Sequence, residues 1–461
     1  MPPLRLQFHG LLASLALLLT SVTAVRADLV TEWNVVALDT MRTSTESPFV
    51  ARDLAIMSLA MFNAEESIRG GYNTYGFGSY TAPGSFSGPV GASYEAAMAA
   101  AANTVMQSLY SGSSSTFTSL YNTQLGAIAD GQAKTDGIAW GISIANDLLT
   151  WRSTDGASGA AGTPYTPVGT VGYWQQTSAS SALLPGWGGV STFAITGTSS
   201  YTTTLPGGTL VDYVQTAQYA ADYNQVKELG AQFSLTRTAD QTNQAYFWAA
   251  GDGTVKMPGM WNEVAQAVAA TAGLSVTDTA RLFAALNVAM ADAGIAAWEN
   301  AYDVQFWRPE TAIANGGDIF FDTDGNPSTE ADGSWLPLIN SPSFPEYAAA
   351  GSAFSAAAAA VLAQYLGDGT AFSLASDING DGTTDLVRNF TGFSQAANEA
   401  AMSGIYGGTQ FGTAVTDGQT MGANIADYVV NNNFALVPEP GGAVLVLLAS
   451  AMLLRRRRWS A

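Results

Sequence analysis

The 461-residue chain contains no cysteine, and its single histidine is His9, which lies in an N-terminal segment typical of a cleaved signal. Without cysteine no disulfide can support the fold. A chain without His9 would have no imidazole, which excludes a Ser-His-Asp triad and the common near-neutral general base. Zinc and copper sites built on histidine or cysteine are excluded as well. Any chemistry would have to rest on carboxylates, hydroxyls and a few arginines.

The first 27 residues are typical of a secretory signal peptide. Arg5 supplies a positive charge, residues 11–24 are mostly apolar, and Val25-Arg26-Ala27 resembles a cleavage site that would leave Asp28 first. An uncleaved anchor helix is the alternative, but the apolar run is short for a membrane span. We therefore expect export and removal of residues 1–27.

Residues 437–461 combine three features in order. Val437-Pro438-Glu439-Pro440 precedes an apolar run at 441–454, and four arginines, Arg455 to Arg458, follow it. Such a segment stops in the membrane with its cationic end on the cytoplasmic side. The tail resembles the PEP-CTERM sorting signal of Gram-negative bacteria. The resemblance implies transient inner-membrane anchoring through 441–454, processing by an exosortase-type machinery, and delivery to the cell surface or extracellular matrix. An ordinary tail anchor is the alternative.

Charge separates the two ends from the rest of the chain. Six of the 17 Lys and Arg residues but one of the 37 Asp and Glu residues fall in the ends, so the remainder carries a net charge near −25. This balance argues against nucleic acid and anionic lipid as partners. It suits an exported protein that meets divalent cations and, as partners, exopolysaccharide or other matrix components. The remaining length is ample for a large core.

Apolar periodicity predicts that residues 28–436 form one mainly α-helical domain. Helices are expected at 48–68, 94–110, 116–149 (one or two, ending before Trp151), 210–229, 239–249, 261–272, 275–307, 346–366, 394–406 and 417–430. Residues 153–206 are rich in Gly, Ser, Thr and Pro, which predicts a long irregular loop region. A polar loop is expected from Arg308-Pro309 to Pro345. No alternating strand pattern is evident.

Two finer expectations concern the long helices. Thr277 is expected to be the N-cap of the helix that follows it, with Asp278 at the positive end of the helix dipole. The run of small residues at Ala356 to Ala360 predicts close packing against another helix.

Four stretches resemble the bacterial vanadium-dependent haloperoxidases, which are relatives of the type 2 phosphatidic acid phosphatases. They are Trp33-Asn34 to Ala64, Pro258 to Ile313 with Phe306-Trp307-Arg308-Pro309-Glu310, Asp324 to Tyr347 with Phe344-Pro345-Glu346-Tyr347, and Phe393 to Gly408. Their order and spacing cover most of the chain between its ends. The resemblance implies an all-α, haloperoxidase-like helical bundle with an oxyanion pocket between helices of the second half.

The family pocket holds vanadate or phosphate with a lysine, two arginines, a Ser-Gly-His turn and a second histidine, because a multiply charged oxyanion needs several cationic and N–H donors. Carried onto this sequence, those positions are Ala301, Arg308, Ala349-Ala350-Gly351, Gly404 and Gln410. Arg308 is the one cation retained. A histidine common in the family's first helix falls on Ser58. Losing charge-assisted bonds of about 1.5–3 kcal/mol each would cost vanadate affinity many orders of magnitude.

Each retained polar residue near the pocket has a structural alternative. Arg308 is expected to cap helix carbonyls or pair with Glu310 or Asp292 rather than bind an anion. Ser352 and Ser355 are interpreted as helix-start residues, because a serine without a base is a poor nucleophile. Glu346 is interpreted as a carboxylate at a helix N-terminus, although it could also face the emptied pocket.

A second candidate site lies at residues 377–385, which fit the first nine positions of an EF-hand-type loop. The oxygen ligands would be Asp377, Asn379, Asp381, Thr383 and Asp385. Position twelve of the loop is Arg388 instead of a bidentate acid. A calcium site and an Asx-rich surface turn both remain open.

These observations predict an exported, surface- or matrix-associated haloperoxidase-like protein that is catalytically degenerate and acts as a binding or structural component. No cofactor is expected beyond possible calcium. The alternative is an active vanadium haloperoxidase, or an acid-phosphatase-type hydrolase with a non-standard site, and that alternative would require vanadate or phosphate at Arg308.

Overall fold

A computed structural model describes residues 28–42, 46–80, 82, 84–177, 180–315 and 324–437. The predicted signal peptide and the sorting tail beyond Val437 lie outside these residues. Helix accounts for 58% of the structure, and strands are few. The all-α prediction is confirmed.

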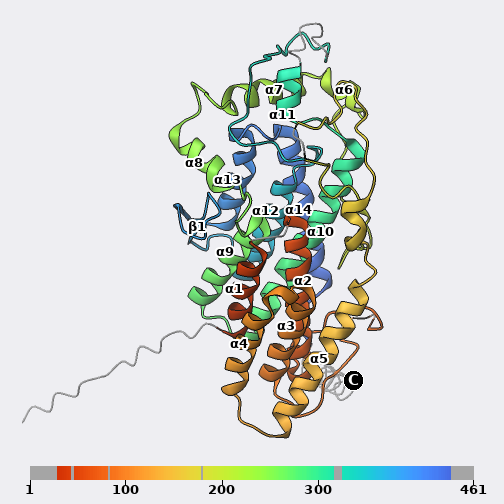
Figure 1. The fold of residues 1–461 in the computed structure, drawn as a ribbon, viewed down its shortest axis with the longest axis vertical. Coiled ribbons are helices and arrows are strands. Elements are labelled where there is room, and N and C mark those ends of the chain that lie inside the picture. The colour runs from red at the N-terminus through yellow and green to blue at the C-terminus, as the bar shows by residue number, and fades with distance from the viewer. Residues whose placement is uncertain are drawn as a thin grey trace, which may run out of the picture.

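The larger helices pack along one elongated body (Figure 1). In chain order they are α1 (Leu29–Met41), α2 (Ser47–Arg69), α3 (Tyr94–Leu109), α4 (Ser114–Gly126), α5 (Gln132–Arg152), α6 (Leu210–Val214), α7 (Ala217–Leu229), α8 (Ala239–Phe247), α9 (Lys256–Ala272), α10 (Val276–Val304), α11 (Pro309–Asn315), α12 (Ala350–Leu366), α13 (Phe393–Tyr406) and α14 (Gly412–Asn432). Short 3-10 helices lie at η1 (Ser111–Ser113), η2 (Ala157–Gly162) and η3 (Trp187–Gly189).

Helix α10 is the common partner of the two halves, because it packs on α2 from the first half and on α12 and α14 from the second. Figure 1 shows α3, α4 and α5 at one end of the body and α6, α7 and α11 at the other. Within the described part of the chain, α10 alone is long and apolar enough to cross a membrane, but most of it is buried inside the protein. Burial of that kind is typical of a core helix.

Small residues let two helix pairs approach closely, one pair in each half. Ideal Cβ atoms on Gly418 and Gly422 of α14 would lie 2.4 and 2.1 Å from the carbonyl oxygens of Ala349 and Ala353. On α5, an ideal Cβ on Gly141 would lie 2.0 Å from the carbonyl oxygen of Ala97 on α3. The close packing predicted from the alanine run is confirmed, and its main partner is α14.

Two strands were missed by the sequence reading. Strands β1 (Phe372–Ser376) and β2 (Leu386–Phe390) form an antiparallel hairpin in which Phe372 pairs with Phe390. The alternation is present in β1, whose residues are buried and exposed in turn, but five residues are too few to stand out in an alanine-rich chain. Helices α1 and α11 were also not predicted.

Several predicted boundaries were wrong. The N-cap of α10 is Ser275, whose side chain accepts from the backbone N–H of Asp278 at 3.1 Å, so Thr277 lies inside the first turn. Helix α9 begins at Lys256 instead of Trp261, α5 continues through Trp151, and α12 begins at Ala350 instead of Glu346.

The described part of residues 153–206 contains two 3-10 helices and neither an α-helix nor a strand, as predicted. The buried carboxylate of Asp292 on α10 holds this region in place. It accepts the backbone N–H groups of Phe193, Ala194 and Ile195 at 2.6 to 3.0 Å. The Asp292 carboxylate on α10 therefore gives these N–H groups the hydrogen bonds that pairing with a strand would otherwise supply.

Candidate functional site

Arg308 lies where the chain leaves α10. Gln305 caps that helix with a left-handed backbone, φ 57°, and the chain then turns so that Arg308 directly precedes α11, which begins at Pro309. Proline is favoured at a first helical position because its missing N–H would have no helical partner. The side chain of Arg308 is 1% exposed.

The guanidinium of Arg308 donates to three backbone carbonyls. Nε bonds the oxygen of Phe344 at 2.9 Å, Nη1 that of Thr409 at 3.1 Å, and Nη2 that of Pro345 at 3.3 Å. The guanidinium carbon also lies 4.5 Å from the centre of the Phe344 ring. Arg308 thereby ties the turn before α14 to the segment before α12.

No carboxylate of the described residues lies within ion-pair distance of Arg308. The predicted pairings with Glu310 and Asp292 are wrong, because Asp292 is occupied by the loop amides. Burial lowers the pKa of Arg308 to about 10, and the nearby Glu346 opposes that effect. Arg308 does bond backbone carbonyls, but all three lie outside the helices, in the segment before α12 and in the turn between α13 and α14, so the predicted capping of helix carbonyls is wrong.

Glu346 is fully buried beside Arg308 but is not at a helix start, because α12 begins four residues later. Its Oε1 accepts the backbone N–H of Phe411 at 2.9 Å, and its Oε2 has no hydrogen-bond partner. Burial raises the pKa of Glu346 to about 8, although Arg308 and the Phe411 N–H lower it. The group is therefore largely protonated at neutral pH.

Helix α12 begins without a side-chain cap. Its N-cap residue is Ala349, and Ala350 and Gly351 follow. An ideal Cβ on Gly351 would meet only the Met257 methyl, at 3.9 Å, so there is space for a side chain at this position. Ser352 is 1% exposed and its Oγ has no hydrogen-bond partner.

Ser355 lies in the second turn of α12, whereas the predicted helix-start role would place it in the first turn. Its Oγ accepts from Trp261 Nε1 at 3.0 Å. The hydroxyl therefore has a structural partner on α9.

Gln410 fills the space beside Gly404. The backbone N–H groups of Thr409 and Gln410 both donate to the Gly404 carbonyl, at 2.9 and 3.2 Å. An ideal Cβ on Gly404 would lie 2.2 Å from Gln410 Oε1. The glutamine amide thus occupies the volume that the first atoms of an arginine at 404 would need.

Ala301 is fully buried in α10 and contributes a methyl group to the core. The structure brings Arg308, Glu346 and the 404–410 turn together through the bonds described above. Two further carboxylates, Asp222 and Asp417, act on Glu346 electrostatically, and both raise its pKa. Three carboxyl groups and one guanidinium now lie where an oxyanion would require a surplus of positive charge.

An amide network that the sequence reading missed joins the two halves. Asn287 Nδ2 donates to Ser58 Oγ at 3.0 Å, Asn262 Nδ2 donates to Asn287 Oδ1 at 2.8 Å, and Asn34 Nδ2 donates to Asn262 Oδ1 at 2.8 Å. The repeated Trp-Asn pair at 33–34 and 261–262 was the available signal. Ser58 therefore has a structural hydrogen-bonding role.

The candidate calcium loop connects β1 to β2 and lies far along the chain from Arg308. Asp377 accepts the backbone N–H groups of Gly380, Asp381 and Gly382 and pairs with Arg42 at 3.1 Å. Asp385 accepts the N–H groups of two loop residues. In the described part of the chain, no three His, Cys, Asp or Glu side chains are grouped so that they could hold a metal ion. The calcium site stays a prediction.

Comparison with known proteins points to one family. Residues 281–438 match the family described as the VCPO second helical-bundle domain. A 149-residue stretch, 29% of this chain, is 30% identical to the vanadium chloroperoxidase of Curvularia inaequalis, and it spans about a quarter (24%) of that relative's length. The sequence similarity to this family's second helical-bundle domain therefore lies in residues 281–438, about a third of the chain.

The fold agrees over a longer range. A bacterial vanadium-dependent iodoperoxidase superposes with a TM-score of 0.72 over 89% of this chain and 98% of its own, at 22% identity. The holo form of a bacterial vanadium-dependent chloroperoxidase gives 0.63 over 85% and 93%, at 15% identity. The haloperoxidase-like helical bundle is confirmed.

Vanadate, which this fold family implies, does not fit the residues of the haloperoxidase-like chain. The region holds one guanidinium, already bonded to three carbonyls, and a fully buried carboxyl next to it. The Gln410 side chain fills space beside Gly404. We therefore derive no step through vanadate.

Proposed function

We propose that this protein is a catalytically degenerate relative of the haloperoxidases that acts as a binding or structural component outside the cell. The observation that carries the proposal is the occupation of Arg308 by three backbone carbonyls, with alanine or glycine at 301, 349, 351 and 404. A bound trianion would need donors that these residues do not supply. The fold can persist because Ala301 is packed in the core, Ala349 and Gly404 are hydrogen-bonded through their backbones, and Arg308 is bonded to carbonyls.

The proposal is tested with the purified protein. We expect no saturable vanadate binding by calorimetry, no bromide oxidation with hydrogen peroxide and vanadate, and no hydrolysis of p-nitrophenyl phosphate above a blank. A vanadium chloroperoxidase measured in parallel supplies the positive control. The rival function, halide oxidation or phosphate-ester hydrolysis at a non-standard site, is supported by the names of the relatives. Turnover that Arg308→Ala abolishes would establish that rival.

The cellular part of the proposal rests on the two ends of the sequence. Residues 1–27 would direct export, and residues 437–461 would hold the chain at the inner membrane until an exosortase-type enzyme releases it to the cell surface or matrix. Fractionation of cells that express the chain with and without residues 437–461 tests this step. We expect the intact chain to reach the surface or matrix fraction and the shortened chain to be released without surface retention. Equal distribution of both chains would contradict the sorting role.

A further inference from the structure

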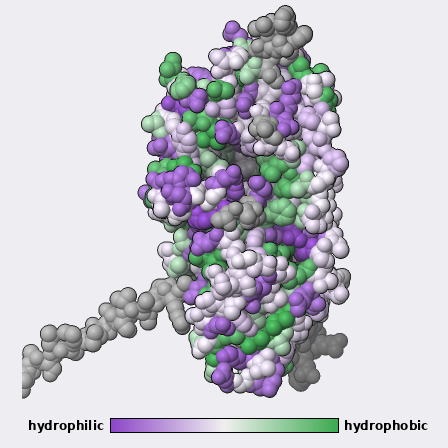
Figure 2. All heavy atoms as spheres, in the orientation of Figure 1, coloured by the Kyte–Doolittle hydropathy of each residue, from purple (hydrophilic) through white to green (hydrophobic). Residues whose placement is uncertain are grey.

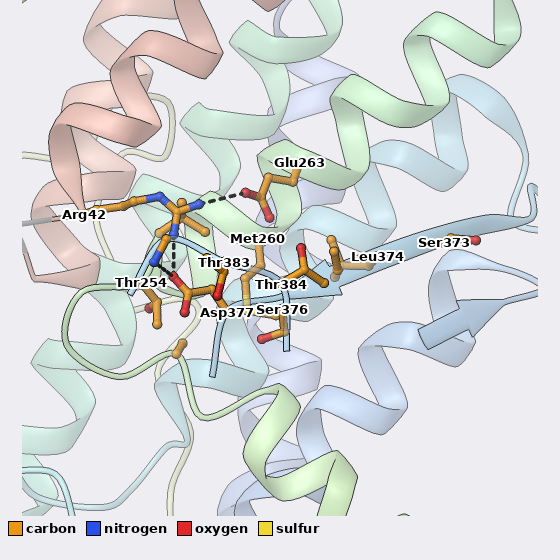
Figure 3. A pocket seen from close by; sticks show the side chains of 14 residues that line it. Arg42, Thr254, Met260, Glu263, Ser373, Leu374, Ser376, Asp377, Thr383 and Thr384 are labelled. Atoms are coloured by element: carbon orange, nitrogen blue, oxygen red, sulfur yellow. Dashed lines mark hydrogen bonds and ion pairs between the residues drawn. The ribbon is translucent and has the colours of Figure 1, made fainter. Parts of the chain in front are cut away.

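A cleft of about 200 Å³ opens between α9 and the β1–β2 hairpin, away from Arg308. Arg42 from the end of α1, Glu263 from α9 and Asp377 from the end of β1 meet at one side of it (Figure 3). Thr384 adds a hydroxyl group, the hydroxyls of Ser373 and Thr383 already donate to Asn389 and Asp381 and can still accept, and Val255, Met260 and Leu374 add apolar surface. The volume is below the 300–1,000 Å³ of pockets for drug-sized ligands, so a smaller molecule is required.

The guanidinium of Arg42 faces three carboxylates. Nη1 lies 3.1 Å from Asp377, Nη2 lies 3.7 Å from Glu263, and Nε lies 3.5 Å from Asp39, and only the Asp377 contact is a hydrogen bond. An anionic ligand would meet three acidic groups around this one cation. The cleft therefore selects against anions and attracts cations.

The two carboxylates that line the cleft differ in what they can accept. Asp377 already accepts three loop N–H groups as well as Arg42. Glu263 has the Arg42 contact at 3.7 Å, which is too long for a hydrogen bond, and its side chain is 29% exposed. Burial raises the pKa of Glu263 to about 7, and Arg42 lowers it. A donor placed in the cleft would supply a hydrogen bond that this carboxylate does not receive from the described residues.

We propose that this cleft binds a small hydroxylated ammonium compound, of the size of one amino sugar, whose ammonium group pairs with Glu263. The ammonium group would replace the missing donor, since charge-assisted bonds are the strong ones. The hydroxyls would exchange bonds with the serine and threonine side chains, and the ring carbons would cover Met260 and Leu374. The inference does not depend on the fate of the Arg308 region.

Glucosamine and glucose form a matched pair of probes, because they differ in one ammonium group for one hydroxyl. Binding to the full protein would be measured by NMR titration at low salt and pH 7, where about half of Glu263 is ionised and an amine is still mostly protonated. We expect glucosamine to bind at least tenfold more tightly than glucose. We expect Glu263→Gln to lower the glucosamine affinity at least tenfold and to leave the weak glucose response unchanged. Glu228→Gln, which changes an exposed acid on α7, is the control and should have no effect.

A second variant keeps the proposal testable if Glu263→Gln does not fold. Thr384→Val removes an exposed hydroxyl from the cleft wall and should weaken glucosamine binding about threefold. Equal affinities for the two sugars would overturn the proposal. So would a glucosamine affinity that neither variant changes, or a cleft that responds to calcium ions alone. Arg308→Ala should not alter glucosamine binding, which separates this test from the test of catalytic loss.

Discussion

Two buried arginine environments, one in each half of the molecule, differ in what balances the charge. In the first half, Arg52 bonds Asp53 and Asp155, both at 2.7 Å, and Arg152 bonds the same Asp155 at 2.8 Å. Burial disfavours the charged form of Arg52, but the two aspartates outweigh it, and its pKa is raised. In the second half, Arg308 has carbonyl partners and a lowered pKa.

The difference lies in how each buried charge is balanced. Arg52 and Arg152 share the counterion Asp155, and Arg52 has Asp53 as well. Arg308 has no carboxylate within ion-pair distance among the described residues, and its three carbonyl bonds satisfy its donors without neutralising its charge. On the function proposed above, the group that once balanced this charge would have been a bound anion.

The largest expected effect comes from removing each arginine in turn. Arg52→Met leaves Asp53 and Asp155 with less positive charge, so we expect a loss of about 3–5 kcal/mol in the free energy of unfolding. Arg308→Met leaves three carbonyls without a donor but also removes a buried charge, so we expect a smaller loss, about 1–3 kcal/mol. Urea denaturation at pH 7 measures both. If Arg308→Met cost as much stability as Arg52→Met, the carbonyl bonds of Arg308 would stabilise the fold as strongly as the ion pairs of Arg52.

A double-mutant cycle tests whether the 404–410 turn has been repacked. Gly404→Ala places a Cβ against the Gln410 side chain, which must rotate its amide away, while alanine is the better helix former, so we expect a loss of at most about 1 kcal/mol. Gln410→Ala alone should cost less, and the double variant should recover most of the first loss. A coupling energy of at least 0.5 kcal/mol, measured by thermal or urea unfolding, is expected for groups in contact. Strict additivity would mean that the glutamine does not occupy this space.

The sequence predicted the fold well because the helices are long and strongly patterned, as in α2 and α10. It missed α1, α11 and the hairpin, which are short or depend on contacts distant in the chain. The positions of the site residues were obtained from motif spacing. Their bonds could not be, since the carbonyl partners of Arg308 belong to residues 36 to 101 positions away. Every residue carries a backbone carbonyl, so the residue types do not indicate which carbonyls bond Arg308.

Glu346 provides a pH test of the second half. Its pKa is about 8 in the folded protein and 4.5 as the ordinary value, so the folded state binds more protons between these limits. Stability from this group is fully present below pH 4.5 and is lost as the pH rises through 8. Glu346→Gln should therefore flatten the decline in unfolding free energy between pH 5 and 8.5, by about 3–4 kcal/mol. Glu330→Gln, an exposed acid, is the control; a decline identical in Glu346→Gln and the wild type would show that Glu346 is ionised when folded.

The smallest effect is expected at the hairpin loop, which carries the oxygen side chains of the predicted calcium site, whereas the Arg308 region carries a single cation. If the loop binds calcium, 1 mM calcium should raise the melting temperature by about 1–3 °C, and a chelator should reverse the change, because a ligand that binds only the folded state stabilises it. Asp381→Asn and Asp385→Asn should abolish the response, since their side chains belong to the loop and do not pair with Arg42. Asp332→Asn, in another exposed turn, should not. A melting temperature unmoved by calcium and chelator would leave the loop as an Asx turn closed by its own amides. In that case both candidate sites of the second half would be closed by backbone hydrogen bonds, carbonyls around the Arg308 cation in one and N–H groups around the loop carboxylates in the other.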